Sequence, residues 1–522
     1  MASPMPLEAP ETRARGRVVI MRSSLNAAQE GVAAARSWAR RRAPSSLPTV
    51  SPRLVVSTWK ETICKVGERG DEALTLADGM QNGMLDFARN RAAVMKEMGP
   101  NAGLLVFGAR EKIRSRDTHY NYRFSSDLYY LCGLTEPGSA IFLSTVAGAE
   151  AFHLFVRESK PEEERWNGIR LGLQGAAEKL GADKAYASGT MQEVLSQLIA
   201  SVDRLHFTFG NDEAYDRTVI GILGSCREGR RQARRGPSEV VDAELILHRL
   251  RMFKQADELE VMAEAARVSA AGHLAGMRGV RPGMNEAELQ GIVESTFKRE
   301  GASCPSFNSI VAGGDRAYVL HYESNDATLA DGELVMVDAG AEVLGYAGDI
   351  SRTYPVGAAF TPAQKLVYEV VLAAQEYAIT LVQVGSTNQQ VHEKTTARLA
   401  ELLRDADILE PAAAEATRTK GIGEYFPHGT GHYLGLDVHD VGTYLERGNR
   451  PFAYRPGMVV TIEPGLYLSA SNLDVRPAFR GISIRIEDDV VVTEAGPRVL
   501  TSGVPKSVSE IESIRAAALG EK

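Results

Sequence analysis

Residues 333–356, ELVMVDAGAEVLGYAGDISRTYPV, contain two extended runs that each carry a carboxylate at one end. The first run is apolar and ends at Asp338, and the second opens directly after Asp349. Glycines between the two runs supply turn freedom, so the pattern predicts a hairpin. Two carboxylates 11 residues apart on its two arms can converge on one point. Asp beside Gly is also ordinary turn chemistry, so this pair alone does not define a site.

Two further strand-like runs also carry an acid near one end. Residues 457–465, GMVVTIEPG, place Glu463 at the end of a continuous apolar run. Residues 481–490, GISIRIEDDV, alternate so that Arg485 and Glu487 share one face of a predicted strand. A buried Glu costs several kcal/mol unless it is paired or binds a metal. Pairing with Arg485 is one explanation for Glu487, but it leaves the acids of the other three strand ends unexplained.

Histidines gather in the same region of the chain. Of the ten histidines, four lie in or beside these runs, namely His321, His428, His432 and His439. His428 and His432 have the spacing of a zinc-binding helix, but the glycines between them disfavour a helix and the glutamate of an HExxH motif is absent. Such glycines instead let the backbone approach a site closely. A lone His is usually a satisfied core residue, whereas four beside four strand-end acids indicate a metal site.

The composition of this donor set indicates the metal chemistry. Ligation dominated by oxygen favours hard or borderline ions such as Mn²⁺, Co²⁺ or Fe²⁺, and Zn²⁺ also fits. Four carboxylates would repel one another around a single ion, so we expect two divalent ions about 3.5 to 4 Å apart with a bridging water. Such a site predicts metal-assisted hydrolysis.

The ordered set Asp338, Asp349, His432, Glu463 and Glu487 is similar to the five metal ligands of the pita-bread metallopeptidases. Within these, the chain resembles the Xaa-Pro aminopeptidases, also called aminopeptidase P, from about residue 84 to about residue 515. The stretches that carry the resemblance are SSDLYYLCGLTEPG (125–138), RWNGIRLG (165–172), FNSIVAGG (307–314), LHY (320–322), VDAGAEVLGYAGDISRTYPVG (337–357), HGTGHYLGLDVHDVG (428–442), TIEPGLY (461–467) and RGISIRIEDD (480–489).

The resemblance implies a fold and a set of metal ligands. The fold is an α/β amino-terminal domain followed by an α+β pita-bread domain of the creatinase/aminopeptidase type. Asp338 would bind one ion, His432 and Glu463 would bind the other, and Asp349 and Glu487 would bridge the two. Glu463 would also take the proton from the attacking water and pass it to the leaving proline nitrogen.

The resemblance also implies roles around the ligands. His321 and His439 would bind substrate and stabilise the tetrahedral intermediate. Arg485 would hold the carboxylate network, and His428 and Tyr467 occupy positions that line the substrate pocket.

The implied function is that of an aminopeptidase that uses two divalent metal ions, and Mn²⁺ is the ion expected. It would cleave the bond between an N-terminal residue and a penultimate proline in peptides. Prolidase, which cleaves only Xaa-Pro dipeptides, is the nearest alternative. Non-catalytic pita-bread modules and metal-free creatinases lack these ligands, all five of which are kept here. The family also implies a homodimer or homotetramer in which Trp166 helps to close a neighbouring subunit's site.

Composition and charge exclude several other classes. The chain has 522 residues, with 59 Lys and Arg against 67 Asp and Glu for a net charge of −8, which argues against a nucleic-acid binder. No apolar run approaches the roughly 18 residues of a membrane span. The four cysteines are far apart and form no CxxC pair, so a reducing, cytoplasmic location is the simplest expectation.

The predicted organisation has four parts. Residues 1–83 form an extension, residues 84–250 the amino-terminal domain, residues 251–515 the catalytic domain and residues 516–522 a tail. Residues 1–55 hold nine Arg, no Lys and three Glu, a composition compatible with organelle targeting. A disordered tail, or an upstream stretch translated from an early start codon, is the favoured explanation of this composition.

Periodicity predicts the main elements of the amino-terminal half. We expect a helix over 84–98, strands over 103–108, 128–134 and 140–144, and strands alternating with helices to about residue 209. Residues 243–277 should form a helix pair that leads into the second domain. The basic tract 227–235 fits a solvated linker or helix face better than a phosphate site.

Overall fold

The computed structural model describes residues 84–228 and 236–520. The predicted extension, residues 1–83, lies outside the described residues, and so does the basic tract after Glu228. In the two described ranges, no helix is both long and apolar enough to cross a membrane.

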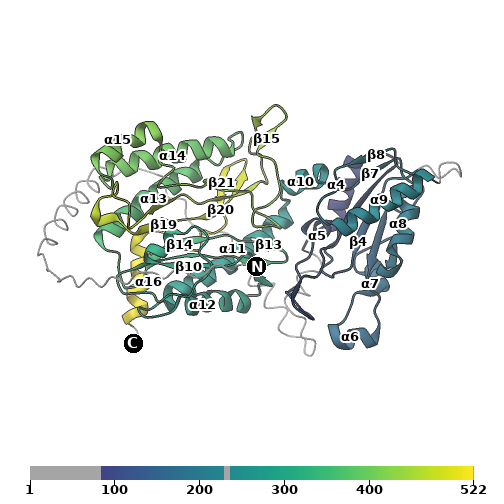
Figure 1. Ribbon diagram of the computed structural model, residues 1–522, viewed down its shortest axis with the longest axis horizontal. Coiled ribbons are helices and arrows are strands. Elements are labelled where there is room, and N and C mark those ends of the chain that lie inside the picture. The colour runs from purple at the N-terminus through teal and green to yellow at the C-terminus, as the bar shows by residue number, and fades with distance from the viewer. Residues whose placement is uncertain (1–83, 229–235, 521–522) are drawn as a thin grey trace, which may run out of the picture. The chain divides into compact units, whose positions relative to one another are not determined.

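The amino-terminal half is an α/β layer structure in which helices flank a sheet (Figure 1). The sheet has six strands in the order β6-β5-β4-β1-β7-β8. The central strand β1 runs parallel to β7 and antiparallel to β4. The strands are β1 (Ala102–Phe107), β4 (Ala140–Ser144), β5 (Phe152–Val156), β6 (Lys184–Ala187), β7 (Arg204–His206) and β8 (Glu239–Val241), with a separate ribbon of β2 (Ile113–Ser115) and β3 (Thr118–His119). The helices are α4 (Phe87–Met98), α5 (Ser126–Cys132), α6 (Pro161–Asn167), α7 (Gly172–Glu178), α8 (Met191–Ala200) and α9 (Glu213–Glu228).

Each face of this sheet is covered by helices. Successive side chains of a strand point to opposite faces, so the apolar side chains of β1 need a helix layer on both faces to be buried. Leu105 of β1 packs with α8 and α9 in one buried cluster. Leu104, its neighbour, packs in another cluster with α4, α5 and the helix α10 (Glu244–Arg251). The helix predicted over 84–98 and the strands predicted over 103–108 and 140–144 are therefore confirmed as α4, β1 and β4.

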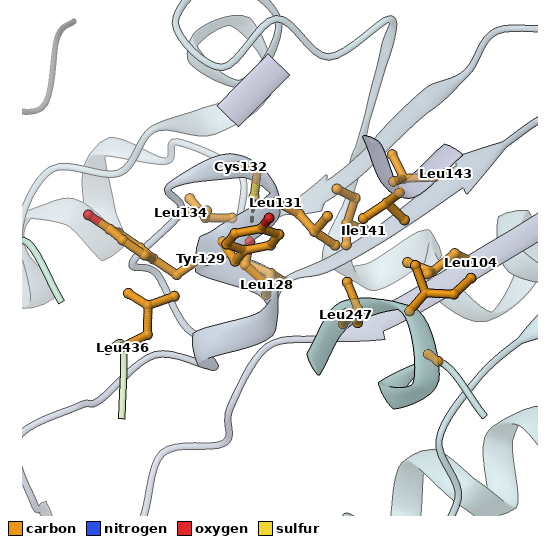
Figure 2. Packing of buried hydrophobic residues seen from close by; sticks show 14 of the residues in the cluster. Leu104, Leu128, Tyr129, Leu131, Cys132, Leu134, Ile141, Leu143, Leu247 and Leu436 are labelled. Atoms are coloured by element: carbon orange, nitrogen blue, oxygen red, sulfur yellow. Dashed lines mark hydrogen bonds between the residues drawn. The ribbon is translucent and has the colours of Figure 1, made fainter. Parts of the chain in front are cut away.

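The strand predicted over 128–134 is wrong, because these residues form most of helix α5. The Ser125 side chain accepts the Leu128 N–H at its start, and Gly133 ends it in the left-handed conformation with φ 70°. All residues of 128–132 are buried, and Figure 2 shows Leu128, Tyr129 and Leu131 in the core with Leu247 and Leu436 nearby. A helix buried on every side lacks a polar face, so its continuous apolar run resembles that of a buried strand.

The second half pairs long helices with short antiparallel sheets. The helix pair predicted over 243–277 is confirmed as α10 (Glu244–Arg251) and α11 (Ala256–Gly279). Helix α11 packs on α12 (Glu286–Arg299), and α13 (Pro362–Thr380) packs on α14 (Asn388–Asp405). The remaining helices are α15 (Pro411–Lys420) and α16 (Val508–Gly520), the latter continuing past residue 515.

The strands of this half form three-stranded sheets of order β10-β11-β14, β13-β12-β9 and β17-β20-β21, with the pairs β18-β19 and β15-β16. Their bounds are β9 (Cys304–Pro305), β10 (Ile310–Gly313), β11 (Leu334–Asp338), β12 (Ala341–Val343), β13 (Tyr346–Ala347), β14 (Ser351–Pro355), β15 (Leu445–Glu446), β16 (Arg450–Pro451), β17 (Val459–Ile462), β18 (Gly465–Leu468), β19 (Ile482–Arg485), β20 (Asp488–Thr493) and β21 (Gly496–Val499).

Two predictions about these strands need comment. The hairpin arms predicted around residues 333–356 do pair, as β11 and β14, but a small ribbon of β12 and β13 lies between them. The single strand predicted over 481–490 is wrong, because it breaks at residues 486–487. Its first half, β19, pairs with β18, and its second half, β20, pairs with β17.

Candidate metal centre and active site

The pairing of β11 with β14 sets the positions of the first two candidate ligands. Asp338, the last residue of β11, lies opposite Ser351, the first residue of β14, and Asp349 precedes that strand by two residues. The intervening ribbon closes on itself tightly. A Cβ on Gly340 would lie 1.7 Å from the Gly348 carbonyl oxygen, so only glycine fits there.

His432 and Glu463 are held together by a second pairing, in which residues 430–434 run alongside β17. The Thr461 N–H donates to the His432 carbonyl oxygen at 2.9 Å, and the Glu463 N–H donates to the Thr430 carbonyl oxygen at 2.8 Å. A Cβ on Gly431 would lie 1.8 Å from the Thr461 carbonyl oxygen. The predicted non-helical, close-packed glycine segment is thus confirmed at Gly431, where the neighbour is a strand.

Glu487 occupies the break between β19 and β20, where it is tied to β14. Its N–H donates to the Ser351 carbonyl oxygen at 3.0 Å, and the Ser351 hydroxyl donates to Glu487 Oε2 at 2.9 Å. Arg485 Nε donates to the same hydroxyl oxygen at 2.9 Å, while its Nη2 pairs with Asp338 Oδ2 at 2.5 Å. The alternative in which Arg485 simply neutralises Glu487 is therefore not observed, since its ion pair is with Asp338.

These elements enclose one cavity of about 450 Å³. Asp349, His432 and Glu487 each offer a ligand atom, and these three atoms lie within 4.8 Å of one another. His432 Nε2 is 3.5 Å from Asp349 Oδ2 and 3.8 Å from Glu463 Oε1. The cavity is lined by all five residues of the predicted ligand set together with His321, His428, His439 and Arg485.

The carboxylates in this cavity carry more negative charge than their surroundings neutralise. Burial raises the pKa of Asp349 well above its ordinary value, and the charges of Asp338, Asp489 and Glu463 raise it further. Burial and the charges of Asp349, Glu463 and Asp338 do the same to the pKa of Glu487.

Two further observations show that the donor set fits a metal. Burial raises the pKa of Glu463 to about 7, although His432 and Arg485 lower it. Asp338 Oδ1 is buried, and none of the residues that the structure describes donates a hydrogen bond to it. Four carboxylates and one imidazole that gather in this way suit divalent ions such as Mn²⁺, Co²⁺, Fe²⁺ or Zn²⁺.

The predicted histidines surround this donor set. The His439 ring lies with its centroid 4.2 Å from that of His432, and burial lowers the pKa of His439, as do His432 and His321. Burial, aided by Arg485, lowers the pKa of His428 to about 4. The imidazoles of His428 and His439 are therefore neutral donors or acceptors near pH 7.

Two predicted substrate residues do not line the cavity. Tyr467 is 2% exposed, and its hydroxyl is tied to His428 Nε2 at 2.8 Å and to Arg485 Nη1 at 3.0 Å, so it lies behind them. Trp166 is on α6 of the amino-terminal half and is 85% exposed. Within the described chain it is absent from this cavity lining.

Sequence reasoning missed two residues that support the donor set. Ser351 connects Arg485 to Glu487, and Asp489 Oδ2 accepts the Asp349 N–H at 3.1 Å. Both are buried, and burial raises the pKa of Asp489 well above its ordinary value. Two features of the sequence could have indicated them. Asp489 belongs to a run of acids that begins at Glu487, and Ser351 is a polar residue in β14.

A buried cluster of carboxylates and imidazoles in an antiparallel domain that follows an α/β domain defines a metal-dependent hydrolase. Residues 260–494 match the model of metallopeptidase family M24, and residues 87–206 match that of the aminopeptidase P N-terminal domain. The chain belongs to the aminopeptidase P members of metallopeptidase family M24. It has their pita-bread fold and is a metallo-aminopeptidase.

Three relatives illustrate the similarity. The Xaa-Pro aminopeptidase of Escherichia coli is 38% identical over 434 residues, covering 83% of this chain and 98% of that protein. The mitochondrial intermediate cleaving peptidase 55 of Arabidopsis thaliana is 31% identical over 429 residues, covering 82% of each. A zinc-substituted E. coli aminopeptidase P in complex with product aligns with TM-score 0.80 and 38% identity, covering 84% of this chain and 99% of that one.

Proposed function

We propose that this metallo-aminopeptidase hydrolyses the bond between an N-terminal residue and a penultimate proline in peptides. The observation that carries the proposal is the cavity in which four carboxylates and His432 meet His321 and His439. The E. coli relative named Xaa-Pro aminopeptidase, almost all of whose length is covered, supports the same substrate class over dipeptides alone.

In this proposal the five residues hold two divalent ions, preferentially Mn²⁺. Asp338 would hold one ion, His432 and Glu463 would hold the other, and Asp349 and Glu487 would serve both. When bound, such ions polarise the scissile carbonyl and lower the pKa of water to near neutrality. The crowded carboxylates and the unpartnered Asp338 Oδ1 support this assignment.

The chain's own residues then move the proton and hold the substrate. Glu463 accepts the proton of the attacking water and returns it to the leaving proline nitrogen, which lacks a hydrogen in the intact imide bond. His321 and His439 face the same cavity and donate hydrogen bonds to the substrate and to the tetrahedral intermediate.

Arg485 keeps this arrangement in place. Burial alone would lower its pKa, but Tyr467, Asp338 and the neighbouring glutamates raise the pKa well above the ordinary value. The guanidinium therefore stays charged, and it orients Asp338 directly and Glu487 through the Ser351 hydroxyl.

The role of Glu463 is tested by Glu463→Ala in protein supplied with excess metal. We expect turnover to fall by at least about 100-fold, since proton transfer alone contributes about 10² to 10⁴ in rate. Circular dichroism should show an unchanged fold, because Glu463 has a partly exposed side chain at a strand end. Turnover near the unaltered rate in metal-replete variant would disprove the assignment.

The substrate class is tested by rates on an Xaa-Pro-Pro tripeptide and an Xaa-Pro dipeptide, each with Mn²⁺ and with chelator. We expect tripeptide cleavage that chelator abolishes and Mn²⁺ restores. Cleavage of the dipeptide alone would refute the aminopeptidase substrate, and full activity after dialysis against chelator would refute the metal mechanism.

The same proposal extends to the assembly and the cell. Residues 84–250 and 251–515 act as amino-terminal and catalytic domains, and exposed Trp166 closes a neighbouring subunit's site in a homodimer or homotetramer. A monomeric form with full activity would refute that role.

The location is cytoplasmic, or an organelle reached through the Arg-rich extension, as the mitochondrial Arabidopsis relative suggests. Fractionation of cells that express the full chain distinguishes the two.

A further inference from the structure

Glu286, the first residue of α12, is a fully buried carboxylate outside the candidate metal centre. Removing a carboxylate from water costs several kcal/mol unless its oxygens receive hydrogen bonds. Here both oxygens receive two each. The donors to Oε1 are Gly313 N at 2.8 Å and Arg316 Nε at 2.8 Å, and the donors to Oε2 are Tyr322 Oη at 2.9 Å and Ala327 N at 3.0 Å.

All four donors belong to one segment, residues 313–327, which begins at the last residue of β10 and carries His321. On the far side of His321, Asn325 fastens the same segment. This buried side chain accepts the Val311 N–H at 2.8 Å and donates to the Ser309 carbonyl oxygen at 2.7 Å. The segment is therefore attached to α12 and to β10 on both sides of the histidine.

In the part of the chain that the structure describes, His321 is not held by hydrogen bonds of its own side chain. Its side chain is exposed and lines the cavity, and within the described residues its imidazole makes no hydrogen bond. The backbone around it must therefore determine where the ring lies. The adjacent residue, Tyr322, supplies one of the four bonds to Glu286.

Capping of α12 does not account for Glu286. Asn285 already caps this helix, since its side chain accepts the Ala287 N–H at 2.8 Å. An acid in the first turn of a helix gains only about 0.3 to 1 kcal/mol from the helix dipole, which is less than the cost of complete burial. The four bonds to the His321 segment are what compensate that cost.

We propose that Glu286 is a positioning residue for the aminopeptidase reaction and that it acts through His321 by holding residues 313–327 against α12. The inference rests on the proposed role of His321 in binding substrate. It makes Glu286 a determinant of kcat/KM although it touches neither substrate nor metal ligands.

The test is a double-mutant cycle of Glu286→Gln and His321→Ala, measured as kcat/KM on the Xaa-Pro-Pro tripeptide with Mn²⁺. Glutamine keeps the shape of the side chain but loses the charge that pairs with Arg316, and its amide NH₂ meets the Ala327 N–H. We expect Glu286→Gln to lower kcat/KM by about 10- to 100-fold with bound metal unchanged, because displacements near 1 Å cost up to about 100-fold.

In the His321→Ala background, the same Glu286→Gln change should alter kcat/KM by less than about 2-fold, the scatter of independent sites. An equal loss in both backgrounds would overturn the proposal, because a general structural defect acts regardless of His321. A crystal structure of Glu286→Gln gives a second readout. We expect residues 313–327 displaced from α12, and an unmoved His321 would also overturn the proposal.

The matched control is Glu258→Gln on α11. Glu258 is equally buried and accepts from the Gln255 N–H at 2.9 Å and the Tyr346 hydroxyl at 2.7 Å, but has no bond to the His321 segment. Whatever its effect, it should be the same with and without His321. If Glu286→Gln does not fold, Tyr322→Phe removes one of the four bonds, and its loss should likewise vanish in the His321→Ala background.

The outcomes separate this inference from the proposed function. Unaltered protein that fails to cleave the tripeptide would refute the proposed function without any use of the variants. Active unaltered protein whose Glu286→Gln form is equally active would refute only the positioning role.

Discussion

His273 of α11 lies directly behind the strand that ends in Asp338. It is fully buried, and its Nε2 donates to the Ala339 carbonyl oxygen at 2.9 Å. Burial and, to a smaller extent, the charge of Arg352 lower the pKa of His273, the hydrogen bond to Ala339 and the charge of Asp338 raise it, and the net value is about 4. A neutral imidazole at this position therefore supports the backbone next to a proposed metal ligand.

This residue predicts a pH dependence of stability. In the unfolded chain the pKa of His273 returns to 6.5, so between pH 6.5 and 4 the unfolded state binds a proton that the folded state does not. Stability from this group is complete above pH 6.5 and falls with acidification, by about 2 kcal/mol between pH 7 and pH 5.

The measurement is urea unfolding of unaltered protein and His273→Gln at pH 7 and pH 5, both in chelator. We expect the variant to lose about 2 kcal/mol less over this interval. Equal losses in the two proteins would show that His273 already carries a proton in the folded state.

At the scale of elements, the pairing of residues 430–434 with β17 decides the geometry of His432 and Glu463. We predict that Gly431→Ala disrupts this pairing, because the new Cβ would lie 1.8 Å from the Thr461 carbonyl oxygen. That oxygen belongs to the backbone of β17, which cannot move away without a loss of stability. The expected cost is about 1 to 3 kcal/mol of stability with loss of metal affinity, measured by thermal unfolding and metal titration.

Gly429→Ala is the matched control in the same segment. A Cβ there would meet no atom closer than 3.9 Å. We therefore expect a free energy of unfolding within about 0.5 kcal/mol of that of the unaltered protein. Similar destabilisation by both substitutions would show that helical or strand propensity, and not the close approach at Gly431, governs this segment.

For the molecule as a whole, metal binding should contribute to stability. The buried carboxylates repel one another, as the raised pKa values of Asp349 and Glu487 indicate, and two cations would relieve that repulsion. An ion at 100 times its dissociation constant adds about 2.7 kcal/mol, so chelation should lower the unfolding temperature by roughly 3 °C for each ion removed.

Thermal unfolding with chelator, and after Mn²⁺ is restored, checks this prediction. The Asp349→Asn variant lacks one proposed bridging ligand and should show a smaller shift. An unfolding temperature that changes neither with chelator nor with added Mn²⁺ would contradict metal binding in the folded protein.

The local patterns of the chain were sufficient for much of the fold. Extended runs that carry an acid at one end predicted β11, β14 and β17, and the helical period predicted α10 and α11. They were insufficient where burial removes the pattern, as in α5, whose residues 128–132 are all buried. The break at 486–487 was also hidden, because it depends on two different partner strands for β19 and β20.

The identities of the acids and histidines and their order along the chain were enough to predict a metal-dependent hydrolase, because both can be read directly from the sequence. The supporting contacts were decided only in three dimensions. Arg485 meets Asp338 at a separation of 147 residues, and Glu286 receives the Tyr322 hydroxyl at a separation of 36. Such bonds leave no periodic mark on the sequence, because a side chain's partner depends on how distant elements pack and not on its neighbours along the chain.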